Sequence, residues 1–285
     1  MWAPTSEKIL MNKEKVILIT GASSGIGQAA AALLLKKGQK VYGAARRMER
    51  MHELELLGMT ALRLDITEEA SCEKCISEVL RREGRIDVLI NNAGYGYYAP
   101  VECSNLNEVR RQLDVNLIGL SRMVKLVLPT MRGQGEGRII NVSSMAGRMH
   151  TAYGAWYHAT KFALEGWSDC LRMELRPFGI KVTLIEPGII LTPWGSIAAQ
   201  HLENCTVDTE YEASARRVAS TMKNFYGGTW GSSPQKPARA IVKAALAKYP
   251  RKRYLVGFLS STAVAMRQIL PTSLYDNLVA KIERM

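Results

Sequence analysis

The sequence contains no apolar run of the roughly 18 residues that a membrane-spanning helix needs, so we expect no transmembrane segment. It has only five cysteines and four histidines among 285 residues, and neither set has the spacing of a disulfide framework or a metal site. Cys72 and Cys75 form a single C-x-x-C inside a helical pattern, which we interpret as structural. Cysteine usage of this kind indicates a reducing compartment, so we expect a cytoplasmic protein that binds no metal.

Acidic residues are missing from one long segment. The chain carries 38 Lys and Arg against 26 Asp and Glu, a net charge of +12. Between Ala213 and Tyr275 there are eleven basic residues and no acidic one, which leaves +1 (12 less 11) for the other 222 residues. Three interpretations stay open: a solvated face, attraction of an anionic lipid or acidic substrate, and peripheral contact with an anionic membrane. The segment has no nucleic-acid-binding motif, so we expect no nucleic-acid partner.

Short apolar, β-branched runs alternate with helical patterns along the chain. This alternation predicts an α/β protein with a doubly wound Rossmann fold, a mostly parallel seven-stranded sheet and helices on both faces. The predicted strands are Lys15–Thr20, Lys40–Ala45, Ala61–Leu64, Ile86–Ile90, Arg138–Val142, Lys181–Ile185 and Tyr254–Val256.

The remaining segments predict helices and one irregular region. We expect helices over Gly27–Lys37, from Glu68, over Leu106–Met131 with a break near Pro129, and over Ala155–Leu175. Residues 1–12 are expected to be a lead-in, followed by one domain over residues 13–285. Within it, residues from about 190 to 231 predict an irregular, mobile lid over the substrate, and residues from about 262 to 285 predict a helical tail interrupted at Pro271.

A glycine-rich turn follows the first predicted strand. Residues Thr20–Gly27 read TGASSGIG, a G-x-x-x-G-x-G spacing that differs from the more common G-x-G-x-x-G. Glycines let the backbone approach a pyrophosphate, whose charge then meets free N–H groups at the start of a helix. The turn therefore predicts a dinucleotide site made by Gly21, Ser23, Ser24, Gly25, Ile26 and Gly27. A glycine-rich turn without a ligand remains the alternative.

The end of the second predicted strand indicates which dinucleotide is bound. A carboxylate at this place bonds the ribose hydroxyl of NAD, whereas an arginine suits the 2′-phosphate of NADP. The strand ends in Ala45 and is followed by Arg46 and Arg47, with no carboxylate. A guanidinium can bind a phosphate through two hydrogen bonds, so we predict NADP(H). The alternative is that both arginines are solvated surface residues.

Three residues form a candidate catalytic set. Tyr157 and Lys161 lie four apart on a predicted helix and therefore share a face. A nearby ammonium and the positive ring of an oxidised nicotinamide would lower the pKa of the tyrosine from its usual ~10. Ser144 follows the fifth predicted strand, at the edge where open α/β sheets bind ligands, and its hydroxyl could hold a substrate carbonyl.

Together these pieces resemble the short-chain dehydrogenase/reductase family. The matching motifs, in the family's order and spacing, are TGASSGIG (Thr20–Gly27), LDIT (Leu64–Thr67), NNAG (Asn91–Gly94), VN (Val115–Asn116), INVSS (Ile140–Ser144), YHATK (Tyr157–Lys161) and EPGIILT (Glu186–Thr192). The resemblance implies an enzyme that acts on the CH–OH group of its donor and exchanges a ketone or aldehyde with an alcohol by hydride transfer. A catalytically weak, NADP-binding regulator on the same fold remains the alternative.

The resemblance also implies roles for individual residues. Tyr157 would be the general acid or base, Lys161 would lower its pKa and bind the nicotinamide ribose, and Ser144 would orient the carbonyl. Asn116 would bend a helix and hold a water molecule. The remaining cofactor contacts would be Asp65 and Ile66 at the adenine, Asn92, Ala93 and Gly94 along the cofactor, and Pro187, Gly188, Ile190 and Thr192 at the carboxamide.

The substrate is less well defined by the sequence. The stretch from Tyr157 to Gly188 is similar to the branch that holds 17β-hydroxysteroid and retinol dehydrogenases and acyl-dihydroxyacetone-phosphate reductases, which implies a hydrophobic carbonyl or alcohol (a steroid, a retinoid or a keto-lipid). A small xenobiotic carbonyl also stays open. The expected pocket is mostly apolar and aromatic, and consists of Tyr95, Tyr97, Ser144, Met145, His150, Thr151, Tyr153, Ile190 and Trp194. The family also implies a homodimer or homotetramer, with Leu120–Leu128 and Phe162–Leu175 as contact faces.

Overall fold

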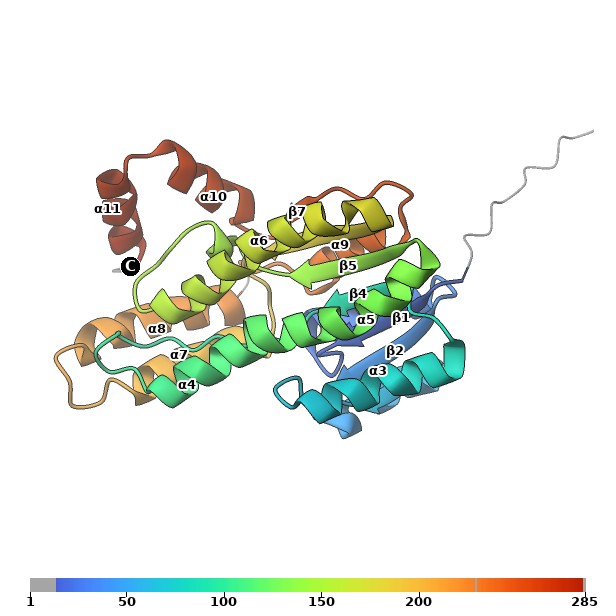
Figure 1. Ribbon diagram of the computed structural model, residues 1–285. Coiled ribbons are helices and arrows are strands. Elements are labelled where there is room, and N and C mark those ends of the chain that lie inside the picture. The colour runs from blue at the N-terminus through green and yellow to red at the C-terminus, as the bar shows by residue number, and fades with distance from the viewer. Residues whose placement is uncertain (1–13, 229, 284–285) are drawn as a thin grey trace, which may run out of the picture.

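The computed structural model describes residues 14–228 and 230–283. Its centre is one sheet of seven parallel strands in the order β3-β2-β1-β4-β5-β6-β7 (Figure 1). The strands are β1 (Val16–Thr20), β2 (Lys40–Ala45), β3 (Thr60–Arg63), β4 (Val88–Asn91), β5 (Gly137–Val142), β6 (Ile180–Pro187) and β7 (Arg253–Val256). The predicted doubly wound fold is confirmed, with a wholly parallel sheet. The expected lead-in over residues 1–12 lies outside the described residues.

Helices cover both faces of the sheet and make two separate cores. One core lies beneath α1 (Gly25–Leu35), α2 (His52–Leu56) and α9 (Gln235–Leu246), and the other beneath α3 (Glu69–Glu83), α5 (Leu120–Gln134) and α6 (Ala155–Leu175). Because the central strands are buried on both faces, they are apolar at almost every position. Cys72 and Cys75 pack into the second core, and burial raises the pKa of the two thiols to about 11 and about 12.

The long helix expected over Leu106–Met131 is interrupted, but not at Pro129. It consists of α4 (Leu106–Leu113), a π-helical turn over Asp114–Gly119, and α5. Pro129 lies inside α5. Both Pro129 and Lys125, whose carbonyl loses its helical donor, lie on the exposed side, where water can satisfy that carbonyl. The predicted break at Pro129 was therefore wrong.

The segment expected to be irregular is mostly helical. It contains α7 (Pro193–Asn204) and α8 (Glu212–Gly227), which pack closely against each other through Ala198, Ala199, Ala215 and Ala219. Small side chains on both helices allow this close approach. The irregular structure predicted for residues 190–231 was therefore wrong. The tail folds as α10 (Ser260–Ile269) and α11 (Thr272–Glu283), with Pro271 between them.

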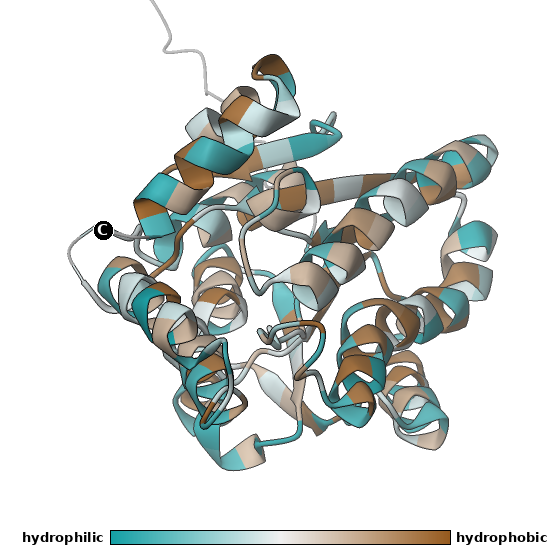
Figure 2. Cartoon of the chain, turned by 90° about the vertical axis from the view of Figure 1, so that its left-hand side faces the viewer, coloured by the Kyte–Doolittle hydropathy of each residue, from teal (hydrophilic) through white to brown (hydrophobic). Residues whose placement is uncertain are grey.

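The order of the strands fixes where a ligand can lie. The chain runs outward from β1 through β2 to β3, and then returns to place β4 on the other side of β1. The crevice between the carboxyl ends of β1 and β4 is the usual ligand site in such sheets. Figure 2 shows that the helices mix hydrophilic and hydrophobic residues along their lengths. Within the described part of the chain, no helix is both long and apolar enough to cross a membrane.

Candidate active site

The glycine-rich turn lies in the crevice between β1 and β4. Thr20 at the end of β1 accepts hydrogen bonds through Oγ1 from the backbone N–H groups of Asn92 and Ala93, both at 3.1 Å. Asn92 Nδ2 donates to the carbonyl oxygens of Thr20 and Gly21, also at 3.1 Å. A Cβ atom at Gly27 would lie 2.4 Å from the Gly21 oxygen, so only glycine permits this packing. These contacts hold the first turn of α1 over the ends of the strands.

The N-terminus of α1 has the features of an anion site. Ser24 precedes the helix, but its side chain makes no capping hydrogen bond, and the first turn contains no acidic residue. The helix therefore begins with backbone N–H groups that no protein carboxylate neutralises. Thr192 lies across from this turn, since a Cβ atom at Gly25 would be 3.2 Å from its methyl group. The Gly21–Gly27 turn and the Pro187–Thr192 segment thus face each other.

Arg46 and Arg47 follow β2 at the same edge of the sheet, and both are exposed. Asp65 and Ile66 follow β3. Burial acts to raise the pKa of the Asp65 carboxyl, but two hydrogen bonds from Thr67 and then the charge of Arg46 lower it below its usual value. Arg46 and Asp65 therefore lie close enough for their charges to interact.

Ser144, Tyr157 and Lys161 meet at the carboxyl end of β5. Tyr157 and Lys161 are 6% and 7% exposed, and Lys161 Nζ lies 5.9 Å from the centroid of the tyrosine ring. Lys161 Nζ donates to the carbonyl of Val142 at 3.0 Å, which fixes the ammonium beneath the end of the strand. The Ser144 hydroxyl donates to the Pro187 carbonyl at 3.5 Å and accepts from the Ala146 N–H at 3.1 Å.

The protein's own groups raise the pKa of Tyr157 rather than lower it. Burial raises the pKa to about 12, while a hydrogen bond with Ser144 acts in the opposite direction. Burial also lowers the pKa of Lys161 to about 8, and the charge of Glu165 partly opposes that shift. Tyr157 is therefore a neutral phenol near neutral pH, the form that can donate a proton. The expected lowering by Lys161 is not produced by the protein's groups alone: burial raises the pKa of Tyr157, and only the hydrogen bond with Ser144 acts to lower it.

Asn116 joins the catalytic helix to the loop after β4. It lies in the π-helical turn, is 1% exposed, and donates through Nδ2 to the Tyr95 carbonyl at 2.9 Å and to Thr160 Oγ1 at 3.2 Å. Its Oδ1 accepts from the Tyr95 N–H at 3.1 Å. A Cβ atom at Gly94 would lie 3.1 Å from Asn116 Oδ1 and 4.0 Å from Lys161 Nζ. Gly94 therefore lines the same space as Lys161, while Asn92 and Ala93 contact the glycine-rich turn.

Aromatic side chains cover the phenol of Tyr157. Trp194 from α7 lies 5.0 Å from it between ring centroids, and Tyr98 lies 5.7 Å away. Tyr226 from α8 lies 5.2 Å from Trp194, and Tyr153 packs on the same cluster. Tyr98 and Tyr226 were not among the predicted pocket residues. Tyr226 stands in a segment predicted to be irregular, and nothing in the sequence distinguishes Tyr98 from its neighbour Tyr97.

Several predicted pocket residues lie apart from this cluster. Tyr97 packs in a different cluster with Val109 and accepts a hydrogen bond from the Asn105 N–H. Tyr95 directs its hydroxyl to the Glu108 carbonyl. His150 Nε2 lies within hydrogen-bond distance of Asp276 Oδ1 on α11, at 2.9 Å. Two others lie near the site: Met145 next to Ser144, and Thr151 bonded to His158 at 3.1 Å. Ile190 pairs with Ser232 in an isolated β-bridge.

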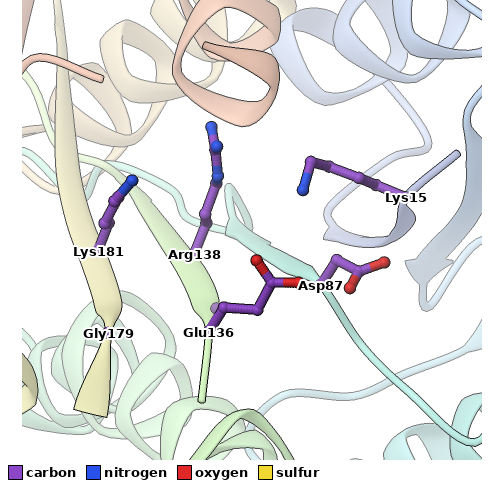
Figure 3. A pocket seen from close by; sticks show the side chains of 7 residues that line it. Lys15, Asp87, Glu136, Arg138, Gly179 and Lys181 are labelled. Atoms are coloured by element: carbon purple, nitrogen blue, oxygen red, sulfur yellow. The ribbon is translucent and has the colours of Figure 1, made fainter. Parts of the chain in front are cut away.

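Two hollows occur at opposite edges of the sheet. A groove of about 400 Å³ runs beside the glycine-rich turn and is lined by Gly25, Gln28, Thr192 and Pro193, among others. A small hollow of about 30 Å³ lies at the amino ends of the strands (Figure 3). Its side chains are of mixed charge and include none of the predicted catalytic residues: Lys15, Asp87, Glu136, Arg138 and Lys181. The groove also includes none of Ser144, Tyr157 and Lys161, but it contains Gly25 and Thr192, which were predicted to contact the cofactor.

Comparison with known proteins agrees with this fold. A solved short-chain dehydrogenase from Streptomyces avermitilis is 31% identical with a TM-score of 0.77, and the match covers 94% of this chain and 95% of that one. The closed form of a serine dehydrogenase complexed with NADP+ is 29% identical with a TM-score of 0.70, over 80% and 87% of the two chains. A 3-ketodihydrosphingosine reductase from Bacteroides thetaiotaomicron is 37% identical over 85% of this chain and 88% of its own. Residues 15–202 match the family model described as short chain dehydrogenase, and the chain therefore belongs to the short-chain dehydrogenase family.

Proposed function

We propose that this protein is an NADP(H)-dependent oxidoreductase that interconverts a hydrophobic ketone or aldehyde and the corresponding alcohol. The observation that carries the proposal is the meeting of Ser144, Tyr157 and Lys161 at the carboxyl end of β5, beside the uncapped N-terminus of α1. A solved relative is complexed with NADP+, and Arg46 and Arg47 follow β2 where a 2′-phosphate would lie.

The residues at the crevice fit a nicotinamide dinucleotide. The glycine-rich turn leaves its backbone N–H groups open to a pyrophosphate, and Gly94 leaves space beside Asn116 and Lys161. The bound cofactor would supply or accept the hydride. The protein's part would be to hold the carbonyl oxygen with the Ser144 hydroxyl and to donate a proton from the neutral Tyr157 phenol. In the oxidation direction, Tyr157 would accept that proton.

The substrate proposal depends on the aromatic side chains above Tyr157. Trp194, Tyr98 and Tyr226 place mostly apolar surface beside the phenol, as a pocket for a hydrophobic ligand requires. The Bacteroides relative is named for a ketone substrate, which agrees with this surface. We therefore expect a steroid, a retinoid or a lipid ketone.

A screen of carbonyl compounds tests the proposal. The purified protein is mixed with NADPH and, separately, with steroid, retinoid and lipid ketones, and the loss of nucleotide fluorescence is followed. We expect turnover with at least one hydrophobic ketone and a lower rate with NADH. Nucleotide binding without oxidation by any carbonyl would contradict the proposal and favour the regulatory alternative.

A further inference from the structure

A partly buried ionic network lies next to the catalytic residues, one helical turn from Lys161 at Glu165. Arg253, the first residue of β7, contacts three carboxylates: Glu165 at 3.2 Å, Asp169 at 2.6 Å and Glu186 at 3.0 Å. Arg148, which follows the turn that carries Ser144, reaches the other oxygen of Glu186 at 3.2 Å. Of these residues, only Glu186 belongs to a family motif, as the first residue of EPGIILT.

The fold brings these charges together from distant parts of the chain. In the β6–β7 pair, Arg253 lies opposite Leu184 and thus on the same face as Glu186, two residues further along β6. Helix α6 covers this face and presents Glu165 and Asp169 one turn apart. The guanidinium therefore lies between the catalytic helix and the end of β6.

Burial makes the network sensitive to the loss of one member. Glu186 is 0% exposed and Glu165 is 7% exposed, so both carboxylates depend on protein partners. Burial and then the charge of Glu186 raise the pKa of Glu165 to about 7, while Ser143 and Arg253 act to lower it. A buried ion whose partner is removed is costly, because neither water nor another charge replaces the partner.

The network touches the catalytic groups on two sides. A Cβ atom at Gly147 would lie 2.8 Å from Glu165 Cγ and 2.9 Å from the Lys161 carbonyl. The turn that follows Ser144 therefore packs on α6 between Glu165 and the turn that carries Lys161. On the other side, Glu186 precedes Pro187, whose carbonyl accepts the Ser144 hydrogen bond. The charges thus connect α6, the Ser144 turn and the Pro187–Thr192 segment.

We propose that Arg253, Glu165 and Glu186 are positioning residues for the reaction, which hold α6 against the end of β6 and thereby set the spacing of Tyr157, Lys161 and Ser144. The inference depends on the proposed function. It also assigns a role to Arg253, one of the eleven basic residues of the Ala213–Tyr275 segment. The cofactor and substrate proposals give these eleven residues no role.

Replacement of Arg253 tests the positioning role. Arg253→Met removes the charge and the hydrogen bonds, and Arg253→Lys retains the charge alone. Arg251→Met is the control, because Arg251 is exposed two residues earlier and its side chain makes no hydrogen bond or ion pair within the described residues. For Arg253→Met we expect kcat to fall by about 10- to 100-fold, the range that a misplaced catalytic group produces, with the Kd for NADPH within about threefold of wild type. Arg253→Lys should be intermediate, and Arg251→Met unchanged.

Glu165→Gln keeps the inference testable if Arg253→Met does not fold. The charged groups around Glu165 are Lys161 and Asp169 on α6, Glu186 on β6 and Arg253 on β7. Arg148 belongs to the same network because it pairs with Glu186. The charge of Glu165 raises the pKa of Lys161, so the substitution Glu165→Gln should lower the pKa of that ammonium. The pH at which alcohol oxidation reaches half its maximal kcat should therefore fall by about half a unit.

The outcomes separate this inference from the proposed function. If the wild-type protein reduces a ketone and Tyr157→Phe does not, the proposed function stands. If in that case folded Arg253→Met retains kcat within about twofold, or Glu165→Gln leaves the pH profile unmoved, the network only stabilises the fold and the positioning role is wrong. Absence of turnover in the wild type with every carbonyl would instead contradict the proposed function.

Discussion

The choice between NADP(H) and NAD(H) depends on the side chains that follow β2. Arg46 and Arg47 are exposed, and β2 ends in Ala45 where an NAD-binding protein would carry a carboxylate. We expect the double substitution Ala45→Asp with Arg46→Ala to reverse the preference for NADPH over NADH. The change in the ratio of the two kcat/KM values should be at least about tenfold, because a hydrogen bond to a charged group contributes about 1.5 kcal/mol or more.

Arg239→Ala is the matched control for this double substitution. Arg239 is an exposed arginine on α9, away from the end of β2, and its removal should leave the cofactor ratio unchanged. If the double variant keeps the wild-type ratio, the two arginines are solvated surface residues and the NADP(H) assignment is wrong.

Single residues differed in how well the sequence predicted them. Thr20–Gly27, Ser144, Tyr157 and Lys161 could be placed because each belongs to a motif with a fixed position relative to a strand or helix. Tyr98 could not, because the backbone direction in an extended loop decides which of two adjacent tyrosines faces Tyr157. The contacts of Arg253 with Glu165 escaped prediction because the two residues are 88 positions apart.

Among the elements, the strands were predicted better than the helices around the site. Buried parallel strands are continuous apolar runs, and all seven were recognised. Helices α7 and α8 were missed because their contact surface is made largely of alanines, which give a weak apolar pattern, and because glycine and serine occur within them. The π-helical turn at Asp114–Gly119 contains no proline, and the two hydrogen bonds of its Asn116 reach Tyr95, 21 residues away, which no local pattern indicates.

Gly119, the last residue of that turn, and Gly133 near the end of α5 should respond oppositely to alanine. A Cβ atom at Gly119 would lie 2.5 Å from the carbonyl oxygen of Ile66, whereas one at Gly133 in α5 would meet nothing within 4 Å. Gly119→Ala should lower the free energy of unfolding by about 1–3 kcal/mol through overpacking. Gly133→Ala should raise it by about 0.5–1 kcal/mol, because alanine favours the helix. Urea unfolding measures both, and equal stability of the two variants would contradict the described packing.

For the whole molecule, the structure divides the positive charge among different places. Arg216 and Lys223 on α8 pair with Glu212 and Glu203, and Arg253 lies in the ionic network. Lys248 lies beside Lys181, at the amino ends of the strands and opposite the active site. These basic residues are therefore spread over α8, β7 and the amino ends of the strands, and a solvated face is the interpretation that this distribution favours.

A salt titration tests that interpretation. We expect kcat/KM for an anionic ketone to stay constant within about twofold from 20 to about 300 mM salt, and the protein not to sediment with anionic vesicles. A matched neutral ketone controls for effects of salt on the protein. A steep loss of kcat/KM confined to the anionic ketone, or binding to anionic but not neutral vesicles, would show that the charge attracts a partner.

The exposed apolar residues of α6 support an oligomer. Phe162 and Met173 are exposed large hydrophobic residues in the Phe162–Leu175 range, which is one of the two expected contact faces. We propose a homodimer or homotetramer, with Phe162→Glu weakening it. Gel filtration should give a mass of at least twice the 31.6 kDa of one chain. Elution of the wild type as a single chain would contradict the proposal.

The most direct test of the proposed catalytic role is a comparison of Tyr157→Phe with the wild type. The substitution removes only the hydroxyl oxygen from a buried ring that packs against Trp194 and Tyr98. We expect NADPH to bind with nearly the wild-type Kd while ketone reduction is abolished, because the proposal assigns the proton for the carbonyl oxygen to the Tyr157 hydroxyl, and the Lys161 ammonium is hydrogen-bonded to the Val142 carbonyl instead. Residual kcat within tenfold of wild type, about 1.4 kcal/mol in the barrier, would contradict the role of Tyr157 as the general acid.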